Sequence, residues 1–438
     1  MVGSVPPAAG TPEPSARESK PWTSGVSQWT TRHVFRTALA VHVAAIRLAR
    51  ALGPATRPAP DGGAVILLTG TFYSDNWIRS HVYPLSLSRR CRRIVVVSTY
   101  PVPAMEKVEL VRPPAWLVSL TGSVVARLVT FGWVAVRRKP DVVAGFHLLL
   151  NGLAAGLLAR LIGAQAMYFC VGGPNETIGG GIYADNRLFA TLREPDAGVE
   201  RLLNEVVDGF DVVIAMGTGA VRHYRHCGVR TAFRVVAGGI DGTRFCRVEQ
   251  DTPIDVVFVG RLAPVKRLDL FLRALQLVQR RVPGVQAAIV GDGELRGPLE
   301  QLARELGVDR HVSFVGQQRD VEVWLRQSKL FVLASDSEGL SLSLMEAMRC
   351  GVPAVVSRTG DLGDLVEDGI NGYLVVDRTP AGFAEPIAAL LTDHERRARF
   401  SAAASHAASR YDVGSVARLW DDILAEAGQP RGFQRSAG

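Results

Sequence analysis

The sequence predicts an α/β protein built from two tandem, Rossmann-like, doubly wound parallel sheets. Its 438 residues, 47% of them hydrophobic, exceed what one core usually holds, so two domains are expected. Short apolar runs that end at glycine alternate with amphipathic stretches, a pattern typical of buried parallel strands and the helices between them. The alternation stops near residues 240–252 and restarts at Asp255, which indicates a second, independent sheet.

The first 60 residues precede the first expected strand. Residues 1–28 are rich in Pro, Ala, Ser and Gly, so we expect a disordered tail that cannot offset the entropy of ordering. They lack an apolar core behind a basic tip, so no secretory signal is expected. Residues 29–60 should form a basic amphipathic helix and a linker; the helix could pack on its own domain or lie on an anionic membrane surface.

Residues 61–245 should form the first domain. Runs such as AVILLTG, RIVVVST, DVVAGFH and DVVIAMG indicate its strands, with helices in right-handed crossovers between them. Segment 115–136 is long enough to span a bilayer. Arg127 in its middle would cost about 2.5–3.5 kcal/mol at the membrane centre. A buried helix of the domain is therefore favoured over a helix that dips into one leaflet.

Residues 250–410 should form the second domain, and residues 411–428 a last helix that crosses back to the first domain. The strands are indicated by DVVFVG, AAIVGDG, VSFVG, LFVLAS, AVVS and GYLVV. The helix after Asp269 repeats apolar residues with a period of 3.6, which places five side chains on one buried face. These are Leu268, Phe271, Leu272, Leu275 and Val278.

Composition limits the chemistry of the protein. The five cysteines are scattered and form no Cys-x-x-Cys pair, which argues against a disulfide framework or a zinc site and favours a reducing, cytoplasmic location. No Asp-x-Asp pair stands at a strand end and no His or Cys cluster has ligand spacing, so neither a metal nor a cofactor is expected. The net charge of +8 suits nucleic acid, an anionic membrane or a phosphorylated small molecule, and does not choose among them.

Ligands of open parallel sheets bind beyond the carboxyl ends of the strands, so function should lie in the loops there. The loop from Gly260 to Lys266 follows a strand and carries two cations, Arg261 and Lys266. The two can grip a diphosphate together, one as a bidentate fork and the other as a point charge. Solvated surface charges are the alternative, but Lys266 is one of only five lysines in this arginine-rich chain.

A second loop carries two glutamates, Glu338 at the end of a strand and Glu346 in the following helix. The backbone between them can offer unpaired amides of a helix N-terminus to a phosphate. Glu338 can accept hydrogen bonds from sugar hydroxyls, and Glu346 from both ribose hydroxyls. Either glutamate alone would more often be a solvated helix residue. The amide positions are Gly339, Leu340, Ser341 and Leu342.

Glu338-x7-Glu346 and the run that follows, Glu-Ala-Met-x-Cys-Gly-Val-Pro-Ala-Val-Val, resemble glycosyltransferase family 4. The loop 260–266, the Val-Gly-Asp-Gly turn at 290–293 and the motif at 368–375 agree in order and spacing, and the resemblance covers about residues 205–415. It implies the GT-B fold and a retaining hexosyltransferase. In that family the paired cations bind the donor diphosphate and the paired glutamates bind sugar and ribose. Arg267 stands where the family usually has Gly.

The first half resembles the family less closely. His147 ends an expected strand, as does the family's histidine that positions groups at the transfer centre, although a structural role is equally open. The family's Gly-Gly loop is replaced here by one that begins with Gly70 and Thr71. A glycine-rich loop with Gly173 and Glu176 is expected on the acceptor side.

The resemblance thus implies a metal-independent enzyme that moves a sugar from a nucleoside diphosphate sugar to a hydroxyl of a lipid-linked glycan, polysaccharide or small molecule. Arg261, Lys266 and the helix dipole would stabilise the departing diphosphate. The enzyme would be cytoplasmic, either free or peripheral on the inner face of the plasma membrane, with no nucleic acid partner. A sugar-nucleotide epimerase on the same fold and a donor-binding protein without transfer activity are the alternatives.

Overall fold

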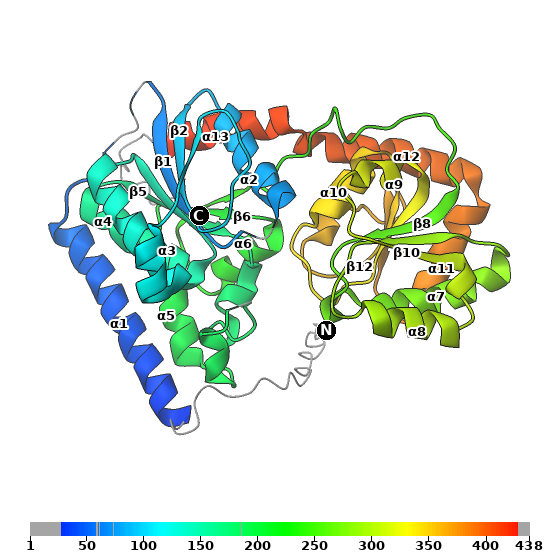
Figure 1. Cartoon of the computed structure of the whole chain (residues 1–438), viewed down its shortest axis with the longest axis horizontal. Helices are drawn as coiled ribbons and strands as arrows, with labels where there is room; N and C mark the ends of the chain where they lie inside the picture. Colours follow the sequence, from blue (N-terminus) through cyan, green and yellow to red (C-terminus); the bar gives the residue numbers. More distant parts are fainter. Residues whose placement is uncertain (1–27, 58–59, 61, 73, 185, 428–438) are drawn as a thin grey trace, which may run out of the picture.

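The computed structural model describes residues 28–57, 60, 62–72, 74–184 and 186–427, and each half of the chain forms its own α/β domain (Figure 1). Apart from Gln28, the first residue of α1 (Gln28–Leu52), the expected tail lies outside the described residues. Each domain holds one parallel sheet with helices packed against it, so the predicted fold class of two tandem doubly wound sheets is confirmed.

The first sheet has seven parallel strands in the order β3-β2-β1-β4-β5-β6-β7. Successive side chains of β1 point to opposite faces of the sheet: Leu67 belongs to one hydrophobic core, and Ile66 and Leu68 belong to the other. Both faces are therefore apolar and are covered by helices. The strands are β1 (Ala64–Thr69), β2 (Cys91–Val97), β3 (Val108–Val111), β4 (Val142–Phe146), β5 (Gln165–Cys170), β6 (Val212–Ala215) and β7 (Ala232–Val235).

One face of this sheet is covered by α1, α3, α4 and α5, and the other by α2 and α13, the last helix among the described residues. Helix α1 packs through Leu39, Val43 and Ile46, and three of its arginines form ion pairs with acidic residues of the same domain. The other helices are α2 (Asp75–Leu87), α3 (Ala115–Arg138), α4 (Leu153–Ile162), α5 (Ala197–Asp208), α6 (Thr218–His226) and α13 (Val413–Ala427).

The second sheet has six parallel strands in the order β10-β9-β8-β11-β12-β13. The apolar face expected for α7 is buried, with each of its five side chains at most 2% exposed. The strands are β8 (Ile254–Val259), β9 (Ala287–Val290), β10 (Val312–Gly316), β11 (Ser328–Leu333), β12 (Ala354–Ser357) and β13 (Gly372–Val375). The helices are α7 (Leu268–Arg281), α8 (Arg296–Glu305), α9 (Val321–Arg326), α10 (Leu342–Arg349), α11 (Pro380–Thr392) and α12 (His394–Ala408).

Helix α3 corrects one expectation. Among the described helices it alone has the length and hydropathy to cross a membrane, yet only 28% of its most apolar stretch is buried. The expectation of a buried helix fails for its outer face, because a helix on a sheet packs through one stripe only. The backbone also bends at Gly122, where φ is 79°. Its outer face exposes Trp116, Leu120, Val124, Val125, Val129, Trp133 and Val136.

Arg127 lies on the inner face of α3 and fixes the helix to the sheet. Its Nη1 atom donates to Thr69 Oγ1 at 2.9 Å, to the Gly70 carbonyl at 3.1 Å and to Asn151 Oδ1 at 2.7 Å. Burial lowers the pKa of this guanidinium to about 10. The charged Arg127, which argued against a membrane span, therefore forms hydrogen bonds inside the domain, at the carboxyl end of β1.

The last helix that the structure describes lies on the first domain. In Figure 1, α12 lies on the second domain while α13 lies beside α2 of the first. Trp420, Ile423 and Leu424 of α13 are at most 3% exposed in the core of the first domain, and Ser88 Oγ donates to Asp421 Oδ1 at 2.6 Å. The two domains are therefore connected twice, by the segment after β7 and by the segment before α13.

Candidate donor and transfer site

Two neighbouring strands of the second sheet position the candidate donor residues. β8 and β11 pair in parallel, so the loops that follow them leave the same edge of the sheet. The loop after β8 carries Arg261 and Lys266, and the loop after β11 carries Glu338. The Asp336 amide donates to the Val265 carbonyl at 2.9 Å, which joins the two loops through their backbones.

The two loops place Lys266 in contact with Glu338, both of which the sequence predicts to bind the donor. Lys266 Nζ forms an ion pair with Glu338 Oε1, and Ser335 Oγ donates to the same oxygen at 2.6 Å. The side chains of Lys266 and Glu338 are 21% and 10% exposed, so the pair is partly shielded from water. Arg261 is exposed, and its side chain makes no hydrogen bond or ion pair with any residue in the described part of the chain. An incoming diphosphate would find one unpaired cation and a second whose carboxylate partner it can displace.

Glycines hold both loops close to neighbouring backbone. At Gly360, with φ of +54°, an added Cβ would lie 1.6 Å from the Glu338 carbonyl oxygen, and at Gly291, with φ of +137°, a Cβ would lie 1.9 Å from the Gly260 carbonyl oxygen. Only glycine fits such approaches. The turn at 290–293, noted in the sequence as a motif, therefore supports the Arg261 loop. Gly360 carried no sequence signal, because its contact with Glu338 exists only in the fold.

Arg267 occupies a strained position just after Lys266. Its φ of 49° lies in the left-handed region, which explains why glycine is usual there. The guanidinium contacts Asp269 Oδ1 at 3.0 Å and Asp336 Oδ1 at 3.2 Å, and Arg378 also contacts Asp336 at 2.9 Å. These ion pairs hold the arginine in place. Asp336 was not identified in the sequence, where it is one acidic residue among many.

The backbone between the two glutamates begins a short helix. Ser341 is the N-cap of α10, and its hydroxyl accepts a hydrogen bond from the Leu344 amide at 3.4 Å. Gly339 before it is exposed, Leu340 is buried and Leu342 is half-buried. The capped amide, that of Leu344, lies just beyond the predicted anion seat at residues 339–342, so a phosphate would rely on the amides before it.

Glu346 is buried, with 4% of its surface exposed, and faces the first domain. Asn76 Nδ2 of α2 donates to Glu346 Oε1 at 2.9 Å. Burial raises the pKa of this carboxyl to about 7, while the Asn76 bond and the charge of Arg244 act in the opposite direction. The carboxylate predicted to bind ribose is covered by the first domain in this arrangement, so ribose would have to take the place of Asn76.

His147 follows β4 directly, and its backbone has an unusual conformation. Its φ is 65°, and Leu150 in the π-helical turn that follows has a φ of 70°. Positive φ values are rare for such residues and are typical of functional sites. The His147 side chain is 19% exposed, and its Nδ1 atom lies 3.4 Å from Glu176 Oε1.

Glu176 is only 1% exposed. Its Oε1 atom accepts from the Gly172 amide at 2.7 Å, and its Oε2 atom accepts from the Leu148 amide. A carboxylate held in this way cannot meet an acceptor directly, in contrast to the acceptor-side position expected for its loop. Its described contacts include His147 and the Leu148 amide in the turn that follows.

The remaining acceptor-side predictions lie at strand ends of the first sheet. Gly70 and Thr71 follow β1, and Thr71 is exposed. A Cβ on Gly70 would lie 2.7 Å from Phe146 Cβ, so the glycine is required by packing beside His147. Gly173, with φ of +61°, follows β5 and has nothing within 4 Å of an added Cβ. These residues border the same edge of the first sheet as His147.

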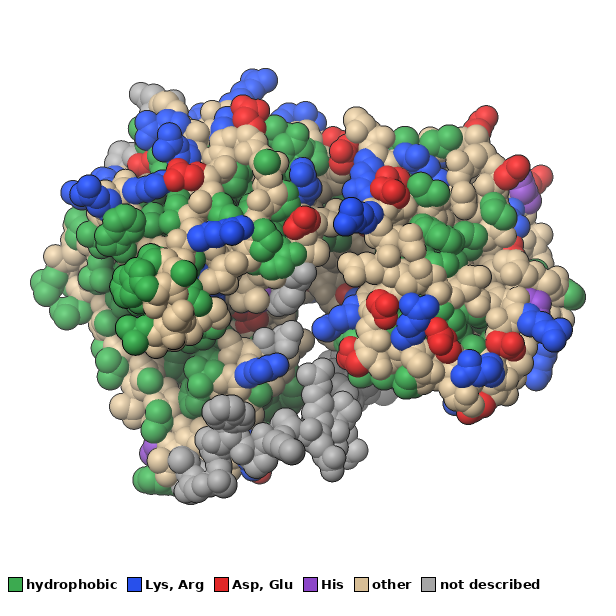
Figure 2. All heavy atoms as spheres, in the orientation of Figure 1, with side chains coloured by type: hydrophobic (Ala, Val, Ile, Leu, Met, Phe, Trp, Pro, Cys, Tyr) green, Lys and Arg blue, Asp and Glu red, His purple; other side chains and the backbone are tan. Residues whose placement is uncertain are grey.

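Hydrogen bonds between described residues join the two domains at two places, and a hollow lies between the domains near the centre of Figure 2. Besides the Asn76–Glu346 bond, the N-terminus of α6 binds two carboxylates of the second domain. The Thr218 amide donates to Asp364 Oδ2 at 2.6 Å, and the Gly219 amide donates to Asp361 Oδ1 at 2.5 Å. Strand-end loops of both sheets therefore face one another across the junction.

The second half of the chain matches known glycosyltransferases. Residues 242–407 match the family model described as Glycosyl transferases group 1. The D-inositol 3-phosphate glycosyltransferase of Frankia alni is 34% identical over 206 residues, which are 42% of this chain and 50% of that protein. The GDP-mannose-dependent alpha-(1-6)-phosphatidylinositol monomannoside mannosyltransferase of Mycolicibacterium smegmatis is 35% identical over 165 residues, 36% of this chain and 43% of that protein. The chain thus spans about half the length of these curated relatives.

Solved structures resemble the whole two-domain arrangement. HepE of Anabaena, in complex with UDP and glucose, is similar with a TM-score of 0.65 and 19% identity over 83% of this chain and 100% of that chain. Sucrose-phosphate synthase from Thermosynechococcus elongatus gives a TM-score of 0.66 and 16% identity over 83% and 98%. Membership of family 4 stays a prediction. At these identities the likeness concerns the fold, and the protein has the GT-B fold with a second domain that matches the glycosyl transferases group 1 family.

Proposed function

We propose that this protein is a hexosyltransferase that moves a sugar from a nucleoside diphosphate sugar to a hydroxyl group. The observation that carries the proposal is the contact between Lys266 and Glu338, made by loops that follow two adjacent strands. It lies within the segment that matches glycosyl transferases group 1. Cation and carboxylate side by side suit a ligand with a diphosphate at one end and a polyol at the other.

Each side chain has one part in the proposed reaction. Arg261 and Lys266 hold the diphosphate and stabilise the charge that grows on it as the bond to the anomeric carbon breaks. Glu338, released from Lys266 by the phosphate, accepts hydrogen bonds from sugar hydroxyls. Glu346 accepts from the ribose after Asn76 moves away. The acceptor oxygen forms the new bond to the anomeric carbon.

His147 is proposed to orient groups at the transfer centre from the opposite domain. Glu176 orients its ring through the contact between Glu176 Oε1 and His147 Nδ1. The acceptor's proton passes to an oxygen of the departing phosphate, and the sugar is transferred with retention of configuration. The chain's own residues supply binding and charge for this step, and no cofactor is required beyond the sugar nucleotide.

A lipid-linked acceptor would be met at a membrane surface, and α3 supports this part of the proposal. Its outer face exposes large apolar side chains, including Trp116 and Trp133. Arg137, Arg138 and Lys139 follow at its C-terminal end. Apolar and basic groups side by side favour peripheral contact with an anionic lipid surface. The protein would then work at the inner face of the plasma membrane.

Activity with a panel of sugar nucleotides tests the reaction. UDP-glucose and GDP-mannose are incubated with wild type, Lys266→Ala and Glu338→Ala, and release of nucleoside diphosphate is measured with and without acceptor glycans or glycolipids. Both variants should lose at least about 100-fold in kcat/KM, because each loses a charge-assisted contact in a water-poor site.

Lys329→Ala and Glu385→Gln are matched controls. Lys329 pairs with Asp255, and Glu385 pairs with Arg281 on the surface of α7 and α11. Both should keep wild-type activity. Equal activity in all five proteins would overturn the site assignment. A changed sugar configuration in the absence of acceptor would indicate an epimerase, and donor binding without turnover under every acceptor would indicate a binding protein.

A further inference from the structure

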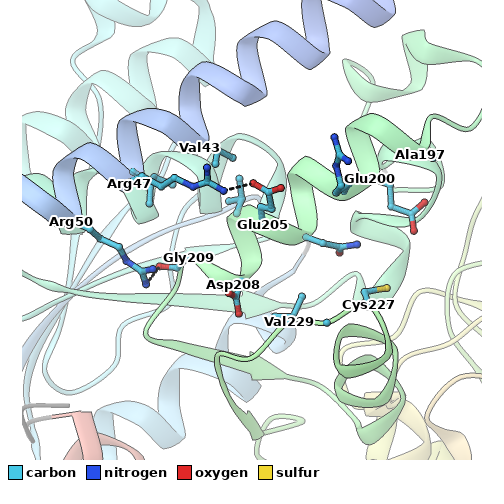
Figure 3. Close-up of a pocket in the computed structure, with 15 residues that line it drawn as sticks. Val43, Arg47, Arg50, Ala197, Glu200, Glu205, Asp208, Gly209, Cys227 and Val229 are labelled. Carbon is cyan, nitrogen blue, oxygen red and sulfur yellow. Dashed lines mark hydrogen bonds and ion pairs between the residues drawn. The ribbon is translucent and has the colours of Figure 1, made fainter. Parts of the chain in front are cut away.

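A cavity of about 470 Å³ lies in the first domain between α1, α5 and the turn after α6. Arg47 and Arg50 line the left side of Figure 3, while Glu200 and Cys227 lie on its right side. None of the proposed donor or acceptor residues lines this cavity. Its function therefore has to be argued from its own side chains.

Three side chains of kinds that can bind a metal ion lie together beside this cavity, and two of them, Glu200 and Cys227, line it. Glu200 lies on α5, His223 on α6, and Cys227 one turn later at the C-cap of α6. One ligand atom from each lies within 4.8 Å of the others. His223 and Cys227 are four residues apart, so a helix places them on one face. No metal ligands were expected from the sequence, because Glu200 is distant in the chain and the Cys–His pair alone is common.

The separation of the sulfur and nitrogen atoms already fits a tetrahedral metal centre. Cys227 Sγ and His223 Nε2 are 3.6 Å apart. Zinc bonds of about 2.3 Å to sulfur and 2.0–2.1 Å to nitrogen, at the tetrahedral angle, put these atoms about 3.6 Å apart. The glutamate oxygen needs a shift of only about 1 Å to reach the same centre, well within a side-chain rotation.

Neighbouring groups prepare the three side chains for this role. Glu200 Oε2 accepts from the Gly179 amide at 2.8 Å, which orients the carboxylate as outer-sphere partners do in metal sites. Asn204, one turn after Glu200, is 9% exposed, and its Oδ1 atom has no hydrogen-bond partner among the described residues.

We propose that Glu200, His223 and Cys227 bind one divalent transition-metal ion, with Zn²⁺ preferred, and that the ion ties α6 to α5. Sulfur, imidazole and carboxylate ligands together are typical of zinc. A thiolate and a carboxylate neutralise the charge of the ion. The fourth position is open to a water molecule that can donate to Asn204 Oδ1. The site does not depend on the proposed transfer reaction.

The test uses untagged, reduced, metal-free protein titrated with Co²⁺ and Zn²⁺. Cobalt should produce a sulfur-to-metal charge-transfer band that saturates at one equivalent, and zinc should abolish it. Competition with a chromophoric chelator gives the zinc affinity. Cys227→Ser and His223→Ala should each weaken the zinc affinity by at least about 100-fold. Loss of an outer-sphere partner alone can weaken metal affinity by up to about 100-fold, and loss of a direct ligand should weaken it at least as much.

His226→Ala and Cys246→Ser are the matched controls, because both residues lie outside the proposed ligand group. Both should bind zinc as wild type does. Zinc should also raise the Tm of wild type and of the controls, but not that of Cys227→Ser, a conservative change at an exposed position that should leave the fold intact. No binding at micromolar zinc, or equal binding in the ligand variants, would overturn the proposal.

Discussion

Replacing Glu346 with glutamine should stabilise the protein above neutral pH and have little effect on stability near pH 4. The wild-type carboxyl is buried at the domain junction, where it accepts a hydrogen bond from Asn76. Glutamine keeps an oxygen that can accept the same bond but has no charge to bury. The variant therefore separates the ionisation of this group from its packing.

The magnitude follows from the shift in pKa. Burial raises the pKa of Glu346 from 4.5 to about 7. Between these values the folded protein keeps a proton that the unfolded chain has released, so the free energy of unfolding falls as pH rises. The contribution of the protonated Glu346 carboxyl to the free energy of unfolding is fully present below pH 4.5 and is lost as the pH rises through 7. At 1.36 kcal/mol per unit, the full loss is about 3 kcal/mol.

Thermal and denaturant unfolding from pH 4 to pH 8.5 measures this effect. The difference between Glu346→Gln and wild type should grow to about 3 kcal/mol, or about 6–12 °C in Tm for a domain of 150–250 residues. Glu109→Gln is the control of opposite sign, because a hydrogen bond from Arg138 lowers the pKa of Glu109. That variant should lose stability at high pH.

A difference between Glu346→Gln and wild type that stays constant with pH would refute this reasoning, because it would mean that the carboxyl ionises equally in the folded and unfolded chain. The same variant should bind a sugar nucleotide more weakly, because glutamine offers one acceptor oxygen where two ribose hydroxyls need two. Unchanged donor affinity would contradict the proposed ribose contact.

Glu176→Gln should lower kcat with little change in the KM for donor and should shift the pH profile of kcat, because the buried carboxylate acts on the site through His147. A fall in Tm with an unchanged pH profile would show a purely structural role. Trp116→Ser combined with Trp133→Ser should reduce sedimentation with anionic vesicles while leaving transfer to a water-soluble acceptor unchanged, because both side chains are exposed on the outer face of α3. Equal vesicle binding by wild type and the double variant would argue against this surface.

Much of the second domain could be predicted because its signals are local. The apolar period of α7 buries five side chains at the expected positions. The rule that ligands bind at strand ends placed Lys266 and Glu338 at the same edge of a sheet, and the structure has them in contact. Their roles remain predictions, but their proximity followed from strand order and parallel pairing.

Other features depend on contacts between residues far apart in the chain. The sequence gives no sign that Asn76 covers Glu346, that Gly360 must approach Glu338, or that Glu176 turns inward to His147. Each of these contacts depends on how two loops or two domains approach one another, and the local periodicity of a sequence does not predict such an approach.

The sequence by itself determined the two α/β domains, their strands and the loops that carry charge, because burial and strand pairing act through short repeating patterns. Only the tertiary structure decided that α3 keeps an apolar face toward solvent and that Glu200 meets His223 and Cys227. The reason is physical. An amphipathic pattern tells which side chains prefer to be buried, whereas the packing of whole helices decides which of them find a partner.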